Sequence, residues 1–277
     1  MKQIVKAILP RPALNKAVQI KDWVYFVTLS QKDFNSANLC SSETIPLSDI
    51  YADTDITEAW EKDHKIIAKA YGDEDSFGGV NPGDRRALYY LIMALKPKNI
   101  LEVGTHIGAS TLHIARALKQ LNANGKVTSA DIIDVNHPET GPWKQLGLKK
   151  SPKDFATELE CIEYIDFDIG PCLDFMNETK QRYDFIFLDG DHTAQAVYKE
   201  VSAALPLLNK NGVILLHDFY PEAKPLYPDN SIIDGPFRAL ERISKENPAI
   251  DVLPLGELPW PTKQGTSITS LALVVKR

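Results

Sequence analysis

Two groups of polar side chains in the second half of the chain have the composition to hold a metal ion or move a proton. Asp189, Asp191 and His192 form the first group, and His217 and Asp218 form the second. Carboxylates that crowd together raise each other's pKa unless a cation or a base shares their site. Oxygen ligands of this kind suit magnesium. The two groups therefore indicate an acidic site that holds magnesium or a similar ion.

Each group follows a short apolar run that is typical of a strand buried on both faces. The runs are Tyr183–Leu188 and Val213–Leu216, and they predict strands of a parallel sheet. Parallel neighbours end at the same edge of a sheet, so we expect the two polar groups to lie together. Apolar residues at helical spacing predict one helix after the first group: Ala194, Val197, Val201, Ala204 and Leu208.

A third strand, turn and helix lie between Asn99 and Leu118. The turn from Gly104 to Gly108 places backbone N–H groups around a crevice at the same edge. It lacks the middle glycine of G-x-G-x-x-G, through which a pyrophosphate contacts the backbone. The acid Glu102 before the turn repels a pyrophosphate and suits an ammonium or sulfonium group. S-adenosylmethionine carries both of these groups.

Two sets of motifs resemble known methyltransferases. The stretch E-V-G-T-x-x-G-x-S, from Glu102 to Ser110, resembles the first motif of class I S-adenosylmethionine-dependent methyltransferases. The strings FLDGDH and LLHDF resemble methyltransferase family 24, which acts on small molecules and secondary metabolites, and the layout is similar to catechol O-methyltransferase. The resemblance covers about residues 78 to 277. It implies an α/β, Rossmann-like fold with a seven-stranded mixed sheet, the last strand antiparallel, and helices on both faces.

The resemblance also implies where S-adenosylmethionine is bound. Asp131 ends a strand predicted over 126–131, where nucleotide-binding α/β folds place a ribose-binding acid; Asp134 is a nearby competitor. Asp168 follows a strand predicted over 162–167 and corresponds to the acid that binds the adenine amino group, with a solvated loop acid as the alternative. The full implied set is Glu102, Gly104, Thr105, Gly108 and Ser110 for the methionine portion, with Asp131, Asp168 and Asp189.

The same likeness implies roles in the reaction. In catechol O-methyltransferase an aspartate and an Asp-Asn pair bind magnesium, and a lysine three positions after the first aspartate deprotonates the hydroxyl. Asp189 and Asp218 match ligand positions, and His192 matches the base. His217 stands where an acid is expected; we count it as a third ligand, although histidine is softer than magnesium prefers. The implied function is metal-assisted methyl transfer to a hydroxyl of a small molecule.

The acceptor and two rival functions stay open at this point. A phenol, a catechol and a sugar hydroxyl are equally compatible with the loop over 219–236, where Phe219, Tyr220 and Tyr227 are available for stacking. A nucleotide-dependent dehydrogenase is disfavoured by the missing glycine. A non-catalytic S-adenosylmethionine-binding module is disfavoured, more weakly, by the clustered acids.

The rest of the chain divides into an appendage, residues 1–71, and a methyltransferase domain, residues 72–277. A helix is predicted from Thr54 to Tyr71, ending at Gly72. Trp23–Leu29 predicts a short strand, or a segment against the main domain or a second subunit. We expect 78–83 to form a loop before a helix, with 80–83 contacting the cofactor. The proline-rich stretch 135–157 predicts an inserted loop with a short helix near 155–159.

Composition bounds the partners and the compartment. The 277 residues are 44% hydrophobic and 25% charged, with a net charge of −6, which is typical of a globular domain. No basic stripe with aromatic residues is present, so a nucleic-acid partner is not expected. Three distant cysteines argue against disulfides or a zinc site. The apolar run before Pro10 is short for a signal peptide, and no run is long enough to span a membrane. We expect a cytoplasmic protein. The oligomeric state stays open at this point, with a homodimer packed across the appendage as one alternative.

Overall fold

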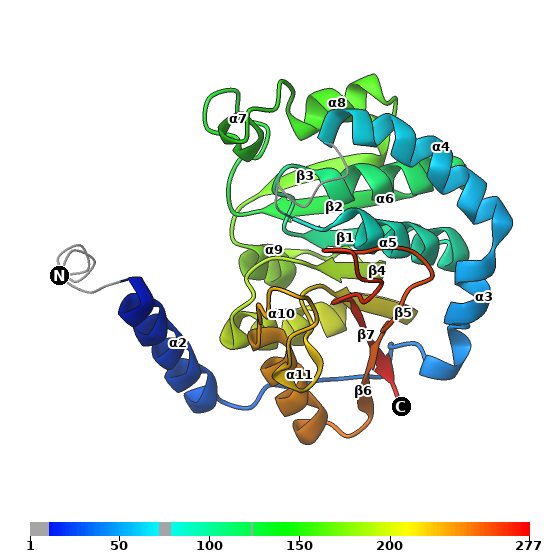
Figure 1. Cartoon of the computed structure of the whole chain (residues 1–277). Helices are drawn as coiled ribbons and strands as arrows, with labels where there is room; N and C mark the ends of the chain where they lie inside the picture. Colours follow the sequence, from blue (N-terminus) through cyan, green and yellow to red (C-terminus); the bar gives the residue numbers. More distant parts are fainter. Residues whose placement is uncertain (1–10, 72–78, 123) are drawn as a thin grey trace.

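A single seven-stranded sheet runs through the protein. The computed structural model describes residues 11–71, 79–122 and 124–277; the expected helix end at Gly72, Gly78 of the loop and the terminus before Arg11 lie outside these ranges. The strand order is β3-β2-β1-β4-β5-β7-β6 (Figure 1). Strands β1 to β5 pair in parallel, and β7 is antiparallel to both of its neighbours. The predicted fold class is therefore confirmed. The strands are β1 Asn99–Val103, β2 Lys126–Asp131, β3 Ile165–Ile169, β4 Tyr183–Leu188, β5 Leu208–Leu216, β6 Ile250–Pro254 and β7 Ala272–Lys276.

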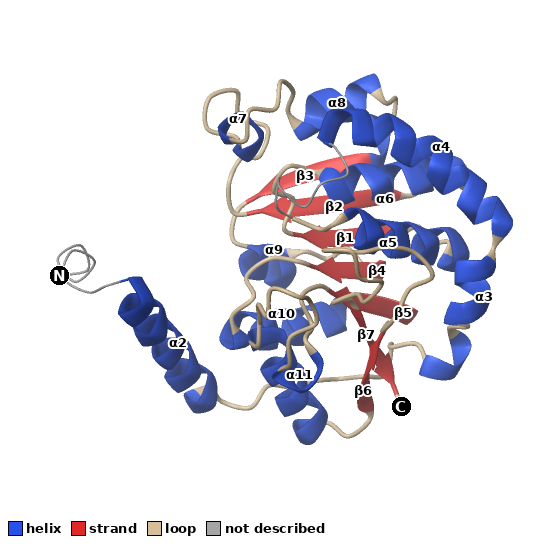
Figure 2. Cartoon of the chain, viewed as in Figure 1, coloured by secondary structure: helices blue, strands red, loops and turns tan. Residues whose placement is uncertain are grey.

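Helices cover both faces of the sheet (Figure 2). Alternate strand residues enter two separate apolar cores: Ile100 packs in one and Leu101 in the other. Both faces are dry, which explains why the central strands appear in the sequence as continuous apolar runs. One face carries α4 Thr54–Tyr71, α5 Pro82–Leu95 and α6 Ala109–Gln120; the other carries α9 Cys172–Glu178, α10 Ala194–Ala204 and α11 Gly235–Glu246. Shorter helices are α3 Leu47–Ala52, α7 Pro142–Gln145 and α8 Pro152–Glu158.

The elements between Arg11 and Tyr71 are all helical. Of the two alternatives for Trp23–Leu29, the strand is wrong: α2 spans Arg11–Thr28 and projects from the body (Figure 1). Only Phe26 of this run is buried, with its ring edge-on to Tyr198. An aromatic and β-branched composition indicates a surface that packs, and it does not by itself distinguish a strand from a helix. The predicted α4 is confirmed.

A buried ion pair fixes α4 on the domain. Asp63 has no exposed surface, and it accepts hydrogen bonds from the guanidinium Nε of Arg116 at 3.0 Å and from the hydroxyl of Tyr89 at 2.9 Å. Breaking a buried ion pair is strongly destabilising, because it leaves an uncompensated charge in the interior. The appendage is therefore continuous with the domain through α4. No helix within the described ranges is long and apolar enough to cross a membrane.

Three predicted boundaries differ from the structure. The strand expected over 162–167 begins at Ile165, after a 3-10 turn, so Asp168 lies inside β3. Leu208 begins β5, while α10 ends at Ala204 because Pro206 cannot continue it. The insertion 135–157 is largely loop, as expected, but its second helix, α8, starts at Pro152. A reciprocal cap between Ser151 and Asp154 sets that start.

Candidate active site

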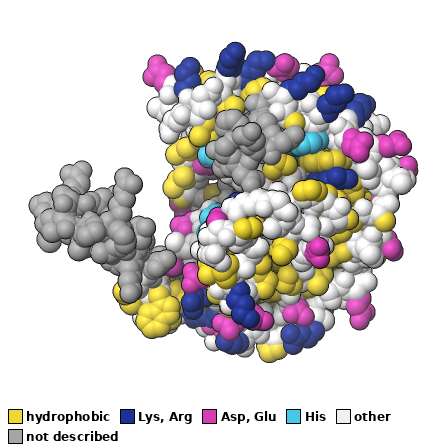
Figure 3. All heavy atoms as spheres, viewed as in Figure 1, with side chains coloured by type: hydrophobic (Ala, Val, Ile, Leu, Met, Phe, Trp, Pro, Cys, Tyr) yellow, Lys and Arg dark blue, Asp and Glu magenta, His cyan; other side chains and the backbone are white. Residues whose placement is uncertain are grey.

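A cavity of about 860 Å³ opens at the carboxyl ends of the parallel strands. Its wall includes Gly104 after β1, Asp131 at the end of β2, Asp189 after β4, and His217 and Asp218 after β5. The space-filling view shows histidine and acidic side chains next to each other on this face (Figure 3). The sheet therefore brings the glycine turn and both polar groups to one edge, as the sequence predicted.

The turn contains two positions, 104 and 108, that accept only glycine. Gly104 has φ of +95°, and a Cβ there would lie 2.2 Å from the carbonyl oxygen of Asp189. Any side chain would push β1 and β4 apart at the cavity. Gly108 has φ of +79°, and a Cβ would lie 2.7 Å from Cβ of Pro152. The glycines are required by the backbone here, in agreement with their place in the motif.

Asp131 organises the turn from the neighbouring strand. Its Oδ2 accepts hydrogen bonds from the backbone N–H of Thr105 at 3.1 Å and of His106 at 2.9 Å, and its Oδ1 accepts one from Ile133. The carboxylate also lines the cavity. Asp134 is not part of the wall, so Asp131 is the better placed of the two acids for a ligand.

Glu102 lies behind the turn, outside the cavity wall. It is fully buried, and its Oε2 accepts hydrogen bonds from the hydroxyls of Thr111 at 2.5 Å and Ser129 at 2.6 Å. Burial raises its pKa to about 7, against the lowering effect of Ser110, Ser129 and Thr111. Of the other residues expected at the cofactor, Gly104, Asp131 and Asp189 line the cavity, whereas Thr105, Gly108, Ser110 and Asp168 do not.

His217 lies between two carboxylates at the inner end of the site. Its Nδ1 is 2.8 Å from Oδ1 of Asp189, and its Nε2 is 3.2 Å from Oδ2 of Asp84. Burial alone would lower the pKa of His217, but Asp189, Asp218 and the two hydrogen bonds outweigh it and place the pKa well above its usual value. An imidazolium that donates from both nitrogens offers no lone pair to a metal, so the structure does not favour His217 as a ligand.

Asp84 is a site residue that sequence reasoning missed. It has no exposed surface, and it accepts hydrogen bonds from the Asn81 side-chain amide at 2.7 Å and the Thr269 hydroxyl at 2.6 Å. In the sequence it appears as an ordinary first-turn acid of α5, which Asn81 caps. Its partner His217 lies 133 positions away, so no local pattern shows the pair.

Glu200 is a second site residue that sequence reasoning missed, and it lines the cavity. It is 6% exposed on α10, where helical spacing alone predicts a solvent-facing acid. Burial, together with the nearby Asp191, raises its pKa to about 7. The sequence carries no signal for this position.

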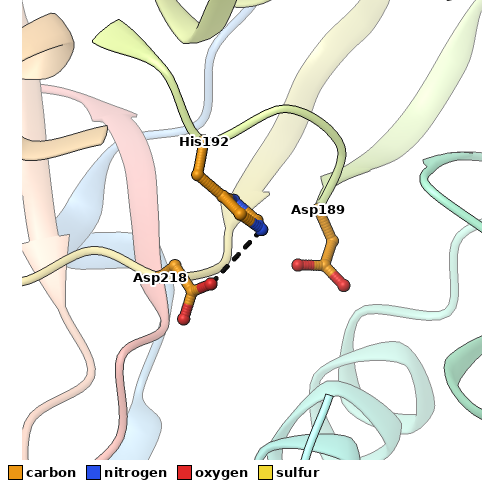
Figure 4. A group of neighbouring side chains, drawn as sticks. All are labelled: Asp189, His192 and Asp218. Carbon is orange, nitrogen blue, oxygen red and sulfur yellow. Dashed lines mark ion pairs between the residues drawn. The ribbon is translucent and has the colours of Figure 1, made fainter. Parts of the chain in front are cut away.

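Asp189, His192 and Asp218 form the open half of the site (Figure 4). One ligand atom from each lies within 4.8 Å of the others. Nε2 of His192 is 3.3 Å from Oδ2 of Asp218, and Asp218 has a left-handed backbone with φ of +56° that turns the chain here. Asp189, His192 and Asp218 are thus the three side chains that can hold one metal ion together, whereas His217 contacts the same two acids through Nδ1, at 2.8 Å from Asp189 and 3.6 Å from Asp218. Two carboxylates fit magnesium, which also keeps water and substrate oxygens as ligands.

Aromatic residues form the wall on the acceptor side. Tyr220 and Tyr227 line the cavity, which agrees with the expected role of the loop over 219–236. Phe219 does not line it; its ring packs 5.8 Å from that of Phe237 instead. Of the loop before α5, Gly79 and Asn81 reach the wall, whereas Val80 and Gly83 do not.

Comparison with known proteins agrees with this geometry. A family model described as a methyltransferase domain, Methyltransf_24, matches residues 101–219. This part of the chain, which is less than half of the 277 residues, is similar to a methyltransferase domain. The matched region runs from β1 to the first residue after Asp218, so it contains the glycine turn and both polar groups of the cavity.

Curated relatives of the methyltransferase domain are distant. Tapetum-specific methyltransferase 1 of Arabidopsis thaliana is 28% identical over 166 residues, which are 57% of this chain and 65% of that protein. Rhamnosyl O-methyltransferase of Mycobacterium leprae is 24% identical over 161 residues, which are 57% of this chain and 63% of that protein. The chain therefore spans less than two thirds of the length of these relatives.

Solved structures share the fold. The O-methyltransferase from Bacillus cereus, in complex with SAH, matches with a TM-score of 0.52 and 22% identity. The match covers 81% of this chain and 91% of that chain. The class I methyltransferase fold predicted from the motifs is thus shown by similarity as well as by strand order.

Proposed function

We propose that this chain transfers a methyl group from S-adenosylmethionine to a hydroxyl of a small molecule. The observation that carries the proposal is the single cavity whose wall holds both the glycine turn and the Asp189–His192–Asp218 group. Methyl transfer needs a nucleophile held in line with the sulfonium carbon, so it is mainly a positioning problem. The similarity to proteins named as O-methyltransferases supports this reaction class.

The cofactor is proposed to lie along the glycine turn. Gly104 leaves the backbone open to the cavity, and Asp131 is placed for the ribose hydroxyls. Glu102, Thr105, Gly108 and Ser110 are not in the wall, so they are proposed to act on the methionine portion by holding the turn from behind. Asp168 is proposed for the adenine amino group, and Asp189 for the ammonium end of the cofactor.

His192 is proposed as the catalytic base. It faces the cavity, and Asp218 is placed to stabilise the imidazolium that forms when the ring accepts the acceptor's proton. Asp189 and Asp218 are proposed to hold a divalent cation, with magnesium as the first candidate. When bound, the cation lowers the pKa of the acceptor hydroxyl and fixes its direction. His217 places a positive charge 2.8 Å from Oδ1 of Asp189.

The acceptor is proposed to be a small molecule with a phenol, catechol or sugar hydroxyl. Tyr220 and Tyr227 line the cavity but are only 1% and 4% exposed, so they shape its wall without presenting an open ring face. Rhamnosyl O-methyltransferase is named for a sugar acceptor, which supports including a rhamnoside among the trial substrates. Secondary metabolism is the proposed setting.

A homodimer is proposed on the exposed face of α2. Ile20, Trp23, Val24 and Val27 recur at helical spacing, and each is between 46% and 57% exposed. A stripe of this kind indicates a protein partner. Sedimentation should give the mass of a dimer for the unmodified chain and of a monomer for Trp23→Glu, which places a charge in the stripe. The same mass for the unmodified chain and the variant would count against the dimer.

The test of the function is transfer of label from methyl-labelled S-adenosylmethionine to a panel of catechols, monophenols and a rhamnoside. We expect label in at least one acceptor and equimolar S-adenosylhomocysteine. Calorimetry with S-adenosylhomocysteine is measured beside it. Binding without transfer to any acceptor would favour a non-catalytic binding module, and no binding at millimolar ligand would overturn the proposal.

A further inference from the structure

A second cavity, of about 540 Å³, lies between α9 and α10. Its wall comes from three separate parts of the chain: the link after α2, the segment from α9 to the start of β4, and the segment from α10 to the start of β5. Only Leu173 also lines the catalytic cavity. We call this second cavity the α9–α10 groove. It takes no part in the methyl transfer proposed above.

The charge of the groove is opposite to that of the whole chain. Lys32, Lys180, Arg182 and Lys199 line it, and no acidic residue is among its lining residues. The chain as a whole has 31 basic and 37 acidic residues. None of these four side chains forms an ion pair within the part of the chain that the structure describes. Like charges that converge without counterions repel one another, so an anion in the groove relieves that repulsion.

The groove floor is apolar. Met176 and Leu207 are almost fully buried there, beside Ala203 and Pro206. The Thr179 and Ser202 hydroxyls stand at the same wall. Apolar lining residues contact a ring or short apolar body, while lysine and arginine in the same wall bind phosphate oxygens. This combination suits a ligand that is apolar at one end and multiply charged at the other.

We propose that the α9–α10 groove binds a phosphate-bearing small molecule of nucleotide size with at least two phosphate groups. A single negative charge would leave most of the four cations uncompensated, so affinity should rise with phosphate number. A nucleic acid strand is disfavoured, because the groove is short and the surrounding chain is net negative. The groove is separate from the catalytic cavity, so the proposal does not rest on the activity.

Calorimetry on the full chain tests the proposal with ADP, AMP and inorganic pyrophosphate as probes. S-adenosylhomocysteine is added in excess to occupy the catalytic cavity. We expect ADP to bind with a Kd below about 1 mM, and AMP to bind at least fivefold more weakly. The Kd for ADP should rise steeply with salt in the unmodified protein, because exposed charges are screened. Absence of ADP binding, or equal affinity for ADP and AMP, would overturn the proposal.

A matched pair of charge reversals locates the site. Lys180→Glu with Arg182→Glu changes two exposed cations of the groove, and Lys62→Glu with Lys65→Glu makes the same change on exposed positions of α4. We expect the first pair to raise the Kd for ADP at least tenfold and the second to change it less than twofold. An equal loss in both would show general electrostatics only and reject the site. Tighter binding of a short oligonucleotide than of ADP, lost in the first pair, would assign the groove to nucleic acid instead.

Discussion

Two histidines stand next to carboxylates in the catalytic cavity, and their surroundings differ. His217 is 8% exposed, with a carboxylate at each ring nitrogen. His192 is 34% exposed, with one nitrogen 3.3 Å from Asp218. A buried ring fixed on both sides keeps its proton, whereas a ring that is open to the cavity on one side is placed to exchange one. We therefore propose that the inner histidine supplies a constant charge and that the outer one supplies proton transfer.

Removal of the outer imidazole tests the proposed role of His192 most directly. His192→Gln keeps a polar side chain of similar length but cannot accept a proton. We expect kcat to fall by about 10² to 10⁴, the usual contribution of a positioned base, while the free energy of unfolding changes by less than about 0.5 kcal/mol. Initial rates at saturating cofactor and urea unfolding measure the two. A rate within tenfold of the unmodified enzyme would remove His192 from the proposed role.

Breaking the inner pair should act on stability first. Asp84→Asn leaves the His217 charge with one carboxylate fewer, and breaking a buried pair costs about 3 kcal/mol. Asp55→Asn, on an exposed first-turn acid of α4, is the control and should change the free energy of unfolding by less than about 0.5 kcal/mol.

The stabilisation from the His217–Asp84 pair should depend on pH. The pKa of His217 is raised in the folded state, so its stabilisation is full below about pH 6.5 and is lost as pH rises through the folded pKa. The unmodified protein should therefore lose stability above pH 6.5, and Asp84→Asn should lose less over that range. Equal slopes in the two proteins would contradict the pairing.

Asp189 and Asp218 could be predicted from the sequence, and Asp84 could not, for a physical reason. Asp189 and Asp218 follow buried strands, and strand ends share an edge in any parallel sheet, so their meeting could be predicted. Asp84 reaches the site through packing of α5 against the sheet, over a separation that no periodicity encodes. His217 and His192 look alike in sequence because each is one residue from an aspartate. Only burial separates their roles, and burial is a property of the folded chain.

The fold followed the same division. Central strands and amphipathic helices were predicted because periodicity reports burial directly. The strand alternative for Trp23–Leu29 was wrong because most of the apolar residues of this run are exposed on α2, where packing inside the chain does not decide the element. The start of β3 was missed because a 3-10 turn at Ile162–Tyr164 has the same apolar composition as a strand.

Glu102 extends the comparison to a buried group with the opposite charge. Its pKa is raised from 4.5 to about 7, so between these values the folded state holds a proton that the unfolded state has lost. Stability therefore falls as pH rises from about 4.5 to 7, by up to about 3 kcal/mol. Glu102→Gln should remove its share of that fall in urea titrations at pH 5 and pH 8. Glu200→Gln should do the same, since its pKa is also about 7; an unchanged pH slope in both variants would mean that neither carboxyl is proton-bound.

Asp218 should give the smallest effect, and it tests whether the two histidines are independent. Its Oδ2 is 3.3 Å from Nε2 of His192, and its Oδ1 is 3.6 Å from Nδ1 of His217. Asp218→Asn removes the charge that stabilises the outer imidazolium, so we expect kcat/KM to fall about tenfold, equivalent to about 1.4 kcal/mol. The inner histidine keeps Asp189 and Asp84, so stability should change by less than about 1 kcal/mol. The second measurement adds magnesium back to enzyme from which a chelator has removed metal ions. If Asp218 holds the cation, the variant needs about tenfold more magnesium than the unmodified enzyme for half-maximal rate. A loss of stability as large as that of Asp84→Asn would show instead that the carboxylates act as one unit and that the histidines do not have separate roles.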